Sequence, residues 1–197
     1  MINKPVAIFG IEGSFHHLAA QKYFGNDIKV HCMESFQTLI ETCSKSDEAP
    51  YGIIAIENSL AGDVNNNCSR VKTANLDIVA EVNLEVNHHL MALMGQDVNE
   101  IKEIRSHPTA INQCKNFLNQ FNNISIIKTG NTAGNAQLIS EKKLKNVAVI
   151  GSEYAANLYG LQILKKRIQD TNDNITKFLV IAKKEKKLNS ITKARYW

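Results

Sequence analysis

The sequence lacks any apolar segment long enough to cross a bilayer, because charged residues interrupt every hydrophobic run. Its first residues, Met1 to Pro5, lead directly into a strand-like run without the apolar stretch of a secretory signal. None of the four cysteines belongs to a Cys-x-x-Cys pair, so neither a disulfide framework nor a cysteine zinc site is expected. These absences favour a cytoplasmic protein with no membrane partner.

A nucleic-acid-binding surface is also missing. The formal net charge is +4, but six basic residues and Glu185 lie from residue 183 onward and contribute +5 of it. The rest of the chain therefore carries −1 and has no basic stripe of the kind that nucleic acids require. We expect residues 183–197 to form a solvated basic tail and no nucleic-acid partner.

Nucleotide-binding fingerprints are absent too. The turn from Gly10 to Ser14 is neither a Gly-x-Gly-x-x-Gly fingerprint nor a P-loop, since it lacks the Lys-Ser/Thr step. We therefore expect no nucleotide and no other cofactor.

What the chain has is 197 residues, 44% of them hydrophobic, which suffices for one domain or two small lobes. Apolar periodicity predicts strands and helices in alternation. The expected strands are Val6–Phe9, Ile28–Cys32, Ile53–Ile56, Leu76–Val82, Leu84–Met94, Ile124–Ile127, Val147–Ile150, Leu161–Ile168 and Thr176–Ala182. The expected helices are His17–Phe24, Phe36–Cys43, one from Pro108 with apolar positions up to Phe121, Thr132–Leu144 and Ser152–Tyr159.

This alternation is typical of an α/β protein with mainly parallel sheets flanked by helices. The run from Leu84 to Met94 is too long for an ordinary strand and could cross between two lobes. Ser106 or His107 would cap the helix that begins at Pro108. Gly160 would end the helix Ser152–Tyr159. Two lobes with a ligand cleft between them are the natural interpretation.

Three turns could bind an anion, because each is rich in small or hydroxyl residues at the start of a helix. They are Gly10–Ser14, Asn58–Gly62 and Asn131–Gly134. The signal is weak in isolation, since ordinary helix caps use the same residue types.

The order and wording of several blocks resemble the prephenate dehydratase family. These blocks run from residue 6 to 181 and comprise Gly10–Phe15, Ala55–Gly62, His88, His107–Ala110 with Gln113-Cys114, Asn131–Ala133 with Ala136, Tyr159–Leu161, Ile168–Asp170 and Asn174–Phe178. The resemblance implies a two-lobed fold similar to type II periplasmic binding proteins, with the last strand returning to the first lobe. Residues 1–75 and 165–182 would form lobe 1 and residues 76–164 lobe 2.

The resemblance also implies an activity, the decarboxylation and dehydration of prephenate to phenylpyruvate by a carbon–oxygen lyase of phenylalanine biosynthesis. Such an enzyme must hold a dicarboxylate and help a ring hydroxyl leave. The family would suggest a homodimer or homotetramer.

Ten site residues follow from the matching blocks. The catalytic block is Thr176, Lys177 and Phe178, and the substrate-binding candidates are Ser14, His16, Asn58, Ser59, Asn131, Thr132 and Ala133. Thr176 takes the place of the family's essential threonine. Its hydroxyl is too weak an acid to protonate a leaving group outright, so a hydrogen bond that strengthens as charge develops is expected.

Two positions depart from the family pattern. Lys177 stands where the family usually has arginine, which keeps the charge but loses the bidentate grip on a carboxylate. We expect Lys177 still to contact a substrate carboxylate. His16 stands where serine or threonine is usual, and it could bind a carboxylate when protonated or extend into solvent.

Glu57, His88 and His89 have structural interpretations that do not involve catalysis or metal binding. Glu57 would repel a dianionic substrate, so a structural role is favoured over general acid catalysis. His88 and His89 are neighbours in an extended run and face opposite sides, so they cannot chelate one metal together. We expect no metal site.

A C-terminal ACT domain, common in the family, has no counterpart in the sequence. Two alternatives to a prephenate dehydratase stay open: an arogenate dehydratase, and a non-catalytic two-lobe small-anion binding protein or sensor. A ligand-sensing domain of a transcription regulator would need a helix-turn-helix, which the sequence does not show. Lys177 and His16 favour the sensor.

Overall fold

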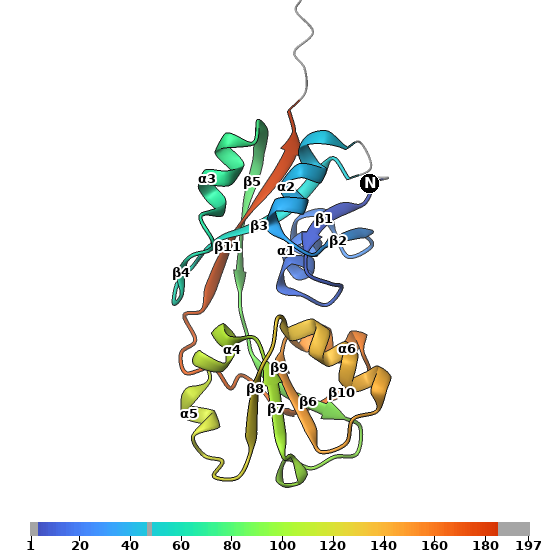
Figure 1. Cartoon of the computed structure of the whole chain (residues 1–197), viewed down its shortest axis with the longest axis vertical. Coiled ribbons are helices and arrows are strands. Elements are labelled where there is room, and N and C mark those ends of the chain that lie inside the picture. Colours follow the sequence, from blue (N-terminus) through green and yellow to red (C-terminus); the bar gives the residue numbers. More distant parts are fainter. Residues whose placement is uncertain (1–3, 47–48, 185–197) are drawn as a thin grey trace, which may run out of the picture.

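The computed structural model describes residues 4–46 and 49–184 of the chain. Figure 1 shows two halves, one above the other, each built on its own sheet. The basic tail predicted from residue 183 lies outside the described residues beyond Lys184. Within the described ranges, no helix is both long and apolar enough to cross a membrane.

The first sheet has its strands in the order β2-β1-β3-β11-β5, and a short strand β4 pairs with β3. Because successive strand residues face opposite sides, Val6 and Ile8 pack under α1 while Ala7 packs under α2 and α3. The bounds are β1 Val6–Phe9, α1 Phe15–Phe24, β2 Val30–Met33, α2 Phe36–Lys45, β3 Tyr51–Asn58, β4 Gly62–Asp63, α3 Asn67–Thr73, β5 Leu76–Glu85 and β11 Ile175–Lys183.

The second sheet has the order β10-β6-β9-β7-β8. Leu90 and Ile150 pack on the side of α4 and α5, whereas Met91 and Val149 pack on the side of α6 and α7. The bounds are β6 His89–Leu93, η1 Val98–Glu100, β7 Glu103–Ser106, α4 Pro108–Asn112, α5 Lys115–Leu118, β8 Ser125–Lys128, α6 Thr132–Lys142, β9 Val147–Gly151, α7 Glu153–Leu158 and β10 Leu161–Lys165.

The predicted α/β class with two lobes is confirmed, but the expected predominance of parallel pairing is wrong. Both sheets are mixed: β1 pairs in parallel with β2 and β3, and β7 with β8 and β9, while the remaining pairs are antiparallel. The cause is the path of the chain. β11 returns from the other half and inserts antiparallel between β3 and β5.

Two connections cross between the halves and lie side by side. Residues 86–88 carry the chain out of the first sheet, as the long run predicted, and residues 166–174 bring it back. The backbone N–H of Val86 donates to the carbonyl of Asn174 at 2.8 Å, and that of Ile168 donates to the carbonyl of His88 at 2.9 Å. The sheets thus divide the chain about ten residues later than the expected boundary at residue 75, because β5 pairs with β11 along its length.

The helix expected from Pro108 to about Phe121 is two short helices. His107 caps the first of them, accepting the backbone N–H of Thr109 at its Nδ1. The second starts anew after Cys114, where the carboxylate of Asp170 accepts the backbone N–H groups of Lys115 and Asn116 at 3.2 and 2.9 Å. An acid from the returning connection therefore replaces the helical hydrogen bonds that periodicity alone predicted.

Candidate active site

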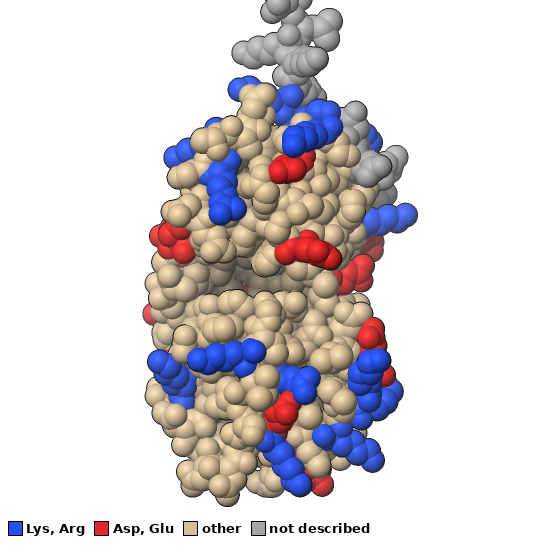
Figure 2. Space-filling view, in the orientation of Figure 1, with Lys and Arg blue, Asp and Glu red and all other residues tan. Residues whose placement is uncertain are grey.

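A cavity of about 790 Å³ lies between the two sheets. Figure 2 shows it as a hollow at the waist of the molecule. The first half contributes the ends of β1 and β3 and the starts of β11, α1 and α2. The second half contributes the starts of α4 and α6. Strand ends and helix starts place backbone N–H groups and short polar side chains around one space, which suits an anionic guest.

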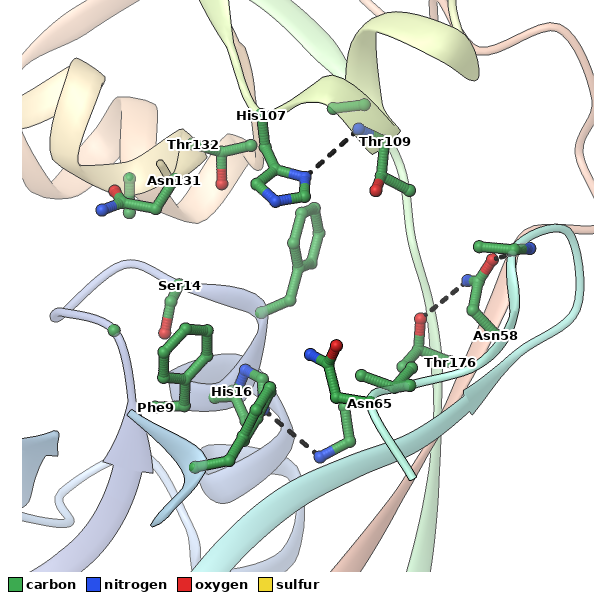
Figure 3. A pocket seen from close by; sticks show the side chains of 18 of the residues that line it. Phe9, Ser14, His16, Asn58, Asn65, His107, Thr109, Asn131, Thr132 and Thr176 are labelled. Atoms are coloured by element: carbon green, nitrogen blue, oxygen red, sulfur yellow. Dashed lines mark hydrogen bonds between the residues drawn. The ribbon is translucent and has the colours of Figure 1, made fainter. Parts of the chain in front are cut away.

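Two of the predicted anion turns open long helices on opposite sides of the cavity. Ser14 caps α1, accepting the backbone N–H of His17 at 3.2 Å, and Asn131 caps α6, accepting the N–H of Gly134. Thr132 and Ala133 line the cavity in the first turn of α6. Figure 3 shows Ser14 on one side and Asn131 and Thr132 on the other.

Thr176 is buried at the cavity wall, and Asn58 holds its hydroxyl. The Nδ2 of Asn58 donates to Thr176 Oγ1 at 2.9 Å, a bond that Figure 3 shows as a dashed line. The Oδ1 of Asn58 in turn accepts the backbone N–H groups of Leu60 and Ala61, which fixes which way the amide faces. Because Thr176 Oγ1 already accepts a hydrogen bond, its own proton is free to donate, and no described residue accepts it.

Gln113 connects this pair to the second half of the molecule. Its Nε2 donates to Asn58 Oδ1 at 3.3 Å, and its Oε1 accepts from Asn174 Nδ2 at 3.0 Å. His88 Nε2 lies 2.8 Å from the same Oε1, so this ring nitrogen carries the proton. Burial lowers the pKa of His88, and the neutral imidazole that results suits a donor to an uncharged amide.

Two predicted site residues lie away from the cavity. Ser59 Oγ donates to the carbonyl of Asp173 at 2.6 Å and accepts the N–H of Ile175, so it braces the segment that leads into β11. The Nζ of Lys177 lies 3.7 Å from a carboxylate oxygen of Glu57, and neither side chain lines the cavity. Alternation along β11 turns Lys177 to the face opposite Thr176 and Phe178. The expected contact between Lys177 and a substrate carboxylate does not fit this geometry.

Arg70 is the one lysine or arginine among the described residues that line the cavity. It comes from α3, a helix that the sequence did not predict, and its guanidinium has no acidic partner among the described ion pairs. Glu34 and Asp63 are the carboxylates that line the same cavity. A guanidinium at this place can pair with a carboxylate of a bound ligand in two parallel bonds.

His16 lines the cavity and is packed among aromatic side chains. Its Nε2 accepts the backbone N–H of Ala55 at 3.3 Å, and its ring packs against three phenylalanines. Burial lowers the pKa of His16 to about 3. The packing of the ring does not fit a side chain extended into solvent, and the lowered pKa favours a neutral ring over a carboxylate-binding imidazolium.

The structure thus brings eight of the ten predicted residues to one cavity. These are Ser14, His16, Asn58, Asn131, Thr132, Ala133, Thr176 and Phe178. Gln113 was missed as a site residue, although it lies in one of the blocks that carry the resemblance. Nothing in the sequence pattern pointed to Arg70.

A family model and the curated relatives agree on one family. A family model described as "Prephenate dehydratase" matches residues 6–186. The curated "Arogenate dehydratase/prephenate dehydratase 2, chloroplastic" of Arabidopsis thaliana is 38% identical over 182 residues, which are 90% of this chain and 46% of that protein. The chain spans about half the length of the curated relatives it matches.

Two solved structures are similar throughout the chain. A prephenate dehydratase from Arthrobacter aurescens in complex with L-Phe aligns with a TM-score of 0.82 at 25% identity, covering 92% of this chain and 61% of that one. GqqA, described as a novel type of quorum-quenching acylase, aligns with a TM-score of 0.82 at 26% identity, covering 93% and 65%.

Proposed function

Because the chain belongs to the prephenate dehydratase family, we propose that it converts prephenate to phenylpyruvate, carbon dioxide and water in the cavity between its two sheets. It would thus act as a carbon–oxygen lyase in phenylalanine biosynthesis. The single observation that carries this proposal is the orientation of the Thr176 hydroxyl by Asn58 at the cavity wall.

The reaction needs a hydrogen-bond donor at the departing oxygen rather than a strong acid. As the bond between the ring and its carboxylate breaks, the electron pair moves into the ring and expels the 4-hydroxyl, which leaves an aromatic product. Charge grows on the departing oxygen, and the proton that completes water comes from solvent. A hydroxyl held by an amide at the cavity wall, with its own proton available to a ligand, stabilises that charge without being ionised itself.

The carboxylate on the side chain of prephenate, which stays in the product, needs a positive partner. Arg70 provides one, in place of the expected Lys177, and the starts of α1 and α6 provide backbone N–H groups with the positive ends of two helices. The acids Glu34 and Asp63 line the same cavity and would disfavour a dianion bound beside them. The side-chain carboxylate of the substrate is therefore expected at Arg70 and at the helix starts.

Arogenate differs from prephenate by an amino group in place of the side-chain ketone. Relatives named for either substrate match this chain, so both belong in the test. Besides turnover of prephenate or of arogenate, the test could show a sensor that binds without turnover. The oriented hydroxyl of Thr176 favours catalysis over such a sensor.

An acylase needs a nucleophile activated by a base. Among the described residues of the cavity, no serine or threonine hydroxyl forms a hydrogen bond with a histidine ring. The geometry therefore supports the dehydratase better than the activity that GqqA is named for.

The proposal extends to the compartment, the oligomeric state and the cofactor requirement of the protein. We expect a cytoplasmic homodimer or homotetramer that needs no cofactor. All four cysteines are free, which suits a reducing compartment.

The test is turnover by the purified chain, followed by the absorbance of phenylpyruvate in base, with prephenate and arogenate in parallel. Thr176→Ala should lower kcat by about 10² or more, the range for loss of one positioned donor, while Thr176→Ser keeps most of it. Thr73→Ala, which removes an exposed threonine outside the cavity, is the matched control. A chain that never exceeds the spontaneous rate, or a Thr176→Ala variant as fast as the control, would overturn the proposal.

A further inference from the structure

An aromatic cluster surrounds His16 at the cavity wall. The ring centroids of Phe9, Phe36 and Phe178 lie 5.6, 5.7 and 5.0 Å from that of His16, and Phe178 meets it edge to face at 89°. All four rings line the cavity, and Figure 3 shows His16 reaching into it from α1 with Phe9 alongside. This part of the wall is aromatic and largely apolar, which suits the packing of a six-membered ring.

The hydrogen bond from Ala55 fixes the proton of His16. The register of β1 on β3 pairs Ile8 with Ile53, and the imidazole takes the backbone N–H of Ala55 two residues further on. Since Nε2 accepts that N–H, it cannot carry a proton, and the single proton of the neutral ring must sit on Nδ1. The lowered pKa agrees with a ring that stays neutral.

No described residue accepts a hydrogen bond from Nδ1 of His16. Among residues 4–46 and 49–184, no hydrogen bond involves His16 Nδ1, and this atom is not sealed within the core. His16 itself lines the cavity, so a ligand bound there can reach its ring. His16 is therefore a neutral donor, set within three phenylalanine rings and left available to a ligand.

We propose that the Nδ1–H of His16 binds the ring carboxylate of the substrate, the group that leaves as carbon dioxide. This inference rests on the proposed function and adds to it the residue that orients the leaving group. The cyclohexadiene ring packs on the phenylalanines, which puts the carboxylate it bears beside His16 and away from the donors around Thr176.

A neutral donor fits this group better than a cation. During decarboxylation the negative charge leaves the carboxylate and spreads into the ring, so a cation here would stabilise the substrate more than the transition state. A single neutral hydrogen bond in an apolar setting orients the carboxylate at a smaller ground-state cost. His16 keeps its proton throughout, and the only bonds that break are the one to the carboxylate and the one to the hydroxyl.

Few titratable groups can disturb this arrangement. The side chains packed on the imidazole are Phe9, Phe36 and Phe178, and none of them titrates. The titratable or charged residues elsewhere on the cavity wall are Glu34, Asp63, Arg70, His88 and His107. The Nδ1–H should thus persist unchanged between pH 5.5 and 8, where an ordinary histidine gains or loses its charge.

Nitrogen NMR of histidine-labelled Thr176→Ala protein tests the inference without turnover. His16, assigned by the signals lost in His16→Gln, should show a protonated Nδ1 and a bare Nε2 across that pH range. Prephenate and a cyclohexadiene carboxylate without the hydroxyl should both shift Nδ1, whereas phenylpyruvate, which has no ring carboxylate, should leave it in place. An imidazolium, a proton on Nε2, or a shift with phenylpyruvate alone would overturn the proposal.

Kinetics supply the second arm. His16→Leu should lower kcat/KM about tenfold, and His16→Gln, whose amide can accept from Ala55 and donate with its nitrogen, should recover most of that loss. His31→Gln, at an exposed histidine outside the cavity, is the control. If the leucine variant matches the control, or glutamine is no better than leucine, His16 is not a donor to the substrate. Absence of turnover with an intact NMR response would defeat the proposed function alone.

Discussion

At the scale of single residues, the positive charge that lines the cavity comes from a different residue than the matching motif suggests. Lys177 belongs to the block that carries the resemblance, yet it pairs with Glu57 on the far side of β11. Arg70, outside every block, lines the cavity. The sequence shows how many cations there are, but only the fold shows which of them faces the ligand.

Replacing Arg70 by alanine should therefore raise KM for prephenate and lower kcat/KM by about tenfold or more, since a charge-assisted hydrogen bond contributes roughly 1.5–3 kcal/mol. Steady-state kinetics at low and high salt would measure it, and the loss should shrink as salt screens the partly exposed guanidinium. Lys177→Ala is the contrast. It removes a surface ion pair, typically about 0.2–1 kcal/mol of stability, and should change kcat/KM less than threefold. The opposite pattern would return the carboxylate contact to Lys177.

Most of the candidate site could be predicted because it is made of helix caps and strand ends. Ser14, Asn58, Asn131 and Thr176 are short polar residues at the start or end of a helix or strand, and such places meet at sheet edges. The protonation of His16 could not be predicted. It depends on the backbone N–H of Ala55, 39 positions away, and on rings that only tertiary packing brings together.

At the scale of helices and strands, the elements with a strong apolar period were predicted within a few residues. α3 and β7 were not, because each is short and offers little period to read. The break between α4 and α5 was missed for another reason. It is imposed by Asp170, which follows in the chain only after the whole of the second sheet.

The contact between β3 and α2 is tight enough to exclude a single methyl group. A Cβ on Gly52 would lie 2.6 Å from Cys43 Sγ and 3.1 Å from a methyl of Leu39. Gly52→Ala should lower the free energy of unfolding by about 1–3 kcal/mol, the usual cost of overpacking, as measured by urea denaturation. The same substitution at Gly130, where a Cβ would meet nothing within 4 Å, is the control.

Cys43→Ala removes the sulfur that causes the clash. Gly52→Ala should then cost less in the Cys43→Ala background than in the wild type, a coupling that a double-mutant cycle detects. An equal cost in both backgrounds would mean that strain elsewhere, and not this contact, opposes the extra methyl.

At the scale of the whole molecule, burial acts on several histidines in the same direction. The pKa values of His16, His17, His88, His89 and His107 all lie below the ordinary value of 6.5, with desolvation as the first cause. In the unfolded chain these residues take up protons below about pH 6.5, whereas the folded chain keeps them neutral. Stability is thus fully present above that pH and falls as the pH drops.

For His16, with a folded pKa of about 3, the loss between pH 7 and 5 amounts to about 2 kcal/mol. Urea unfolding at the two pH values should show a smaller loss for His16→Gln than for the wild type. Equal losses would mean that His16 is charged, or free to become so, in the folded protein.

The two crossing segments also bear on how the chain could be cut and rejoined. Since Val86 bonds Asn174 and Ile168 bonds His88, the points where the chain leaves and re-enters the first sheet are neighbours. Everything between them is topologically an insert with adjacent ends, so it could be excised, with a short linker closing the gap, or exchanged for the corresponding cassette of a relative. Chimaeras joined at these two points would separate the chemistry of Thr176 from the anion contacts at α6.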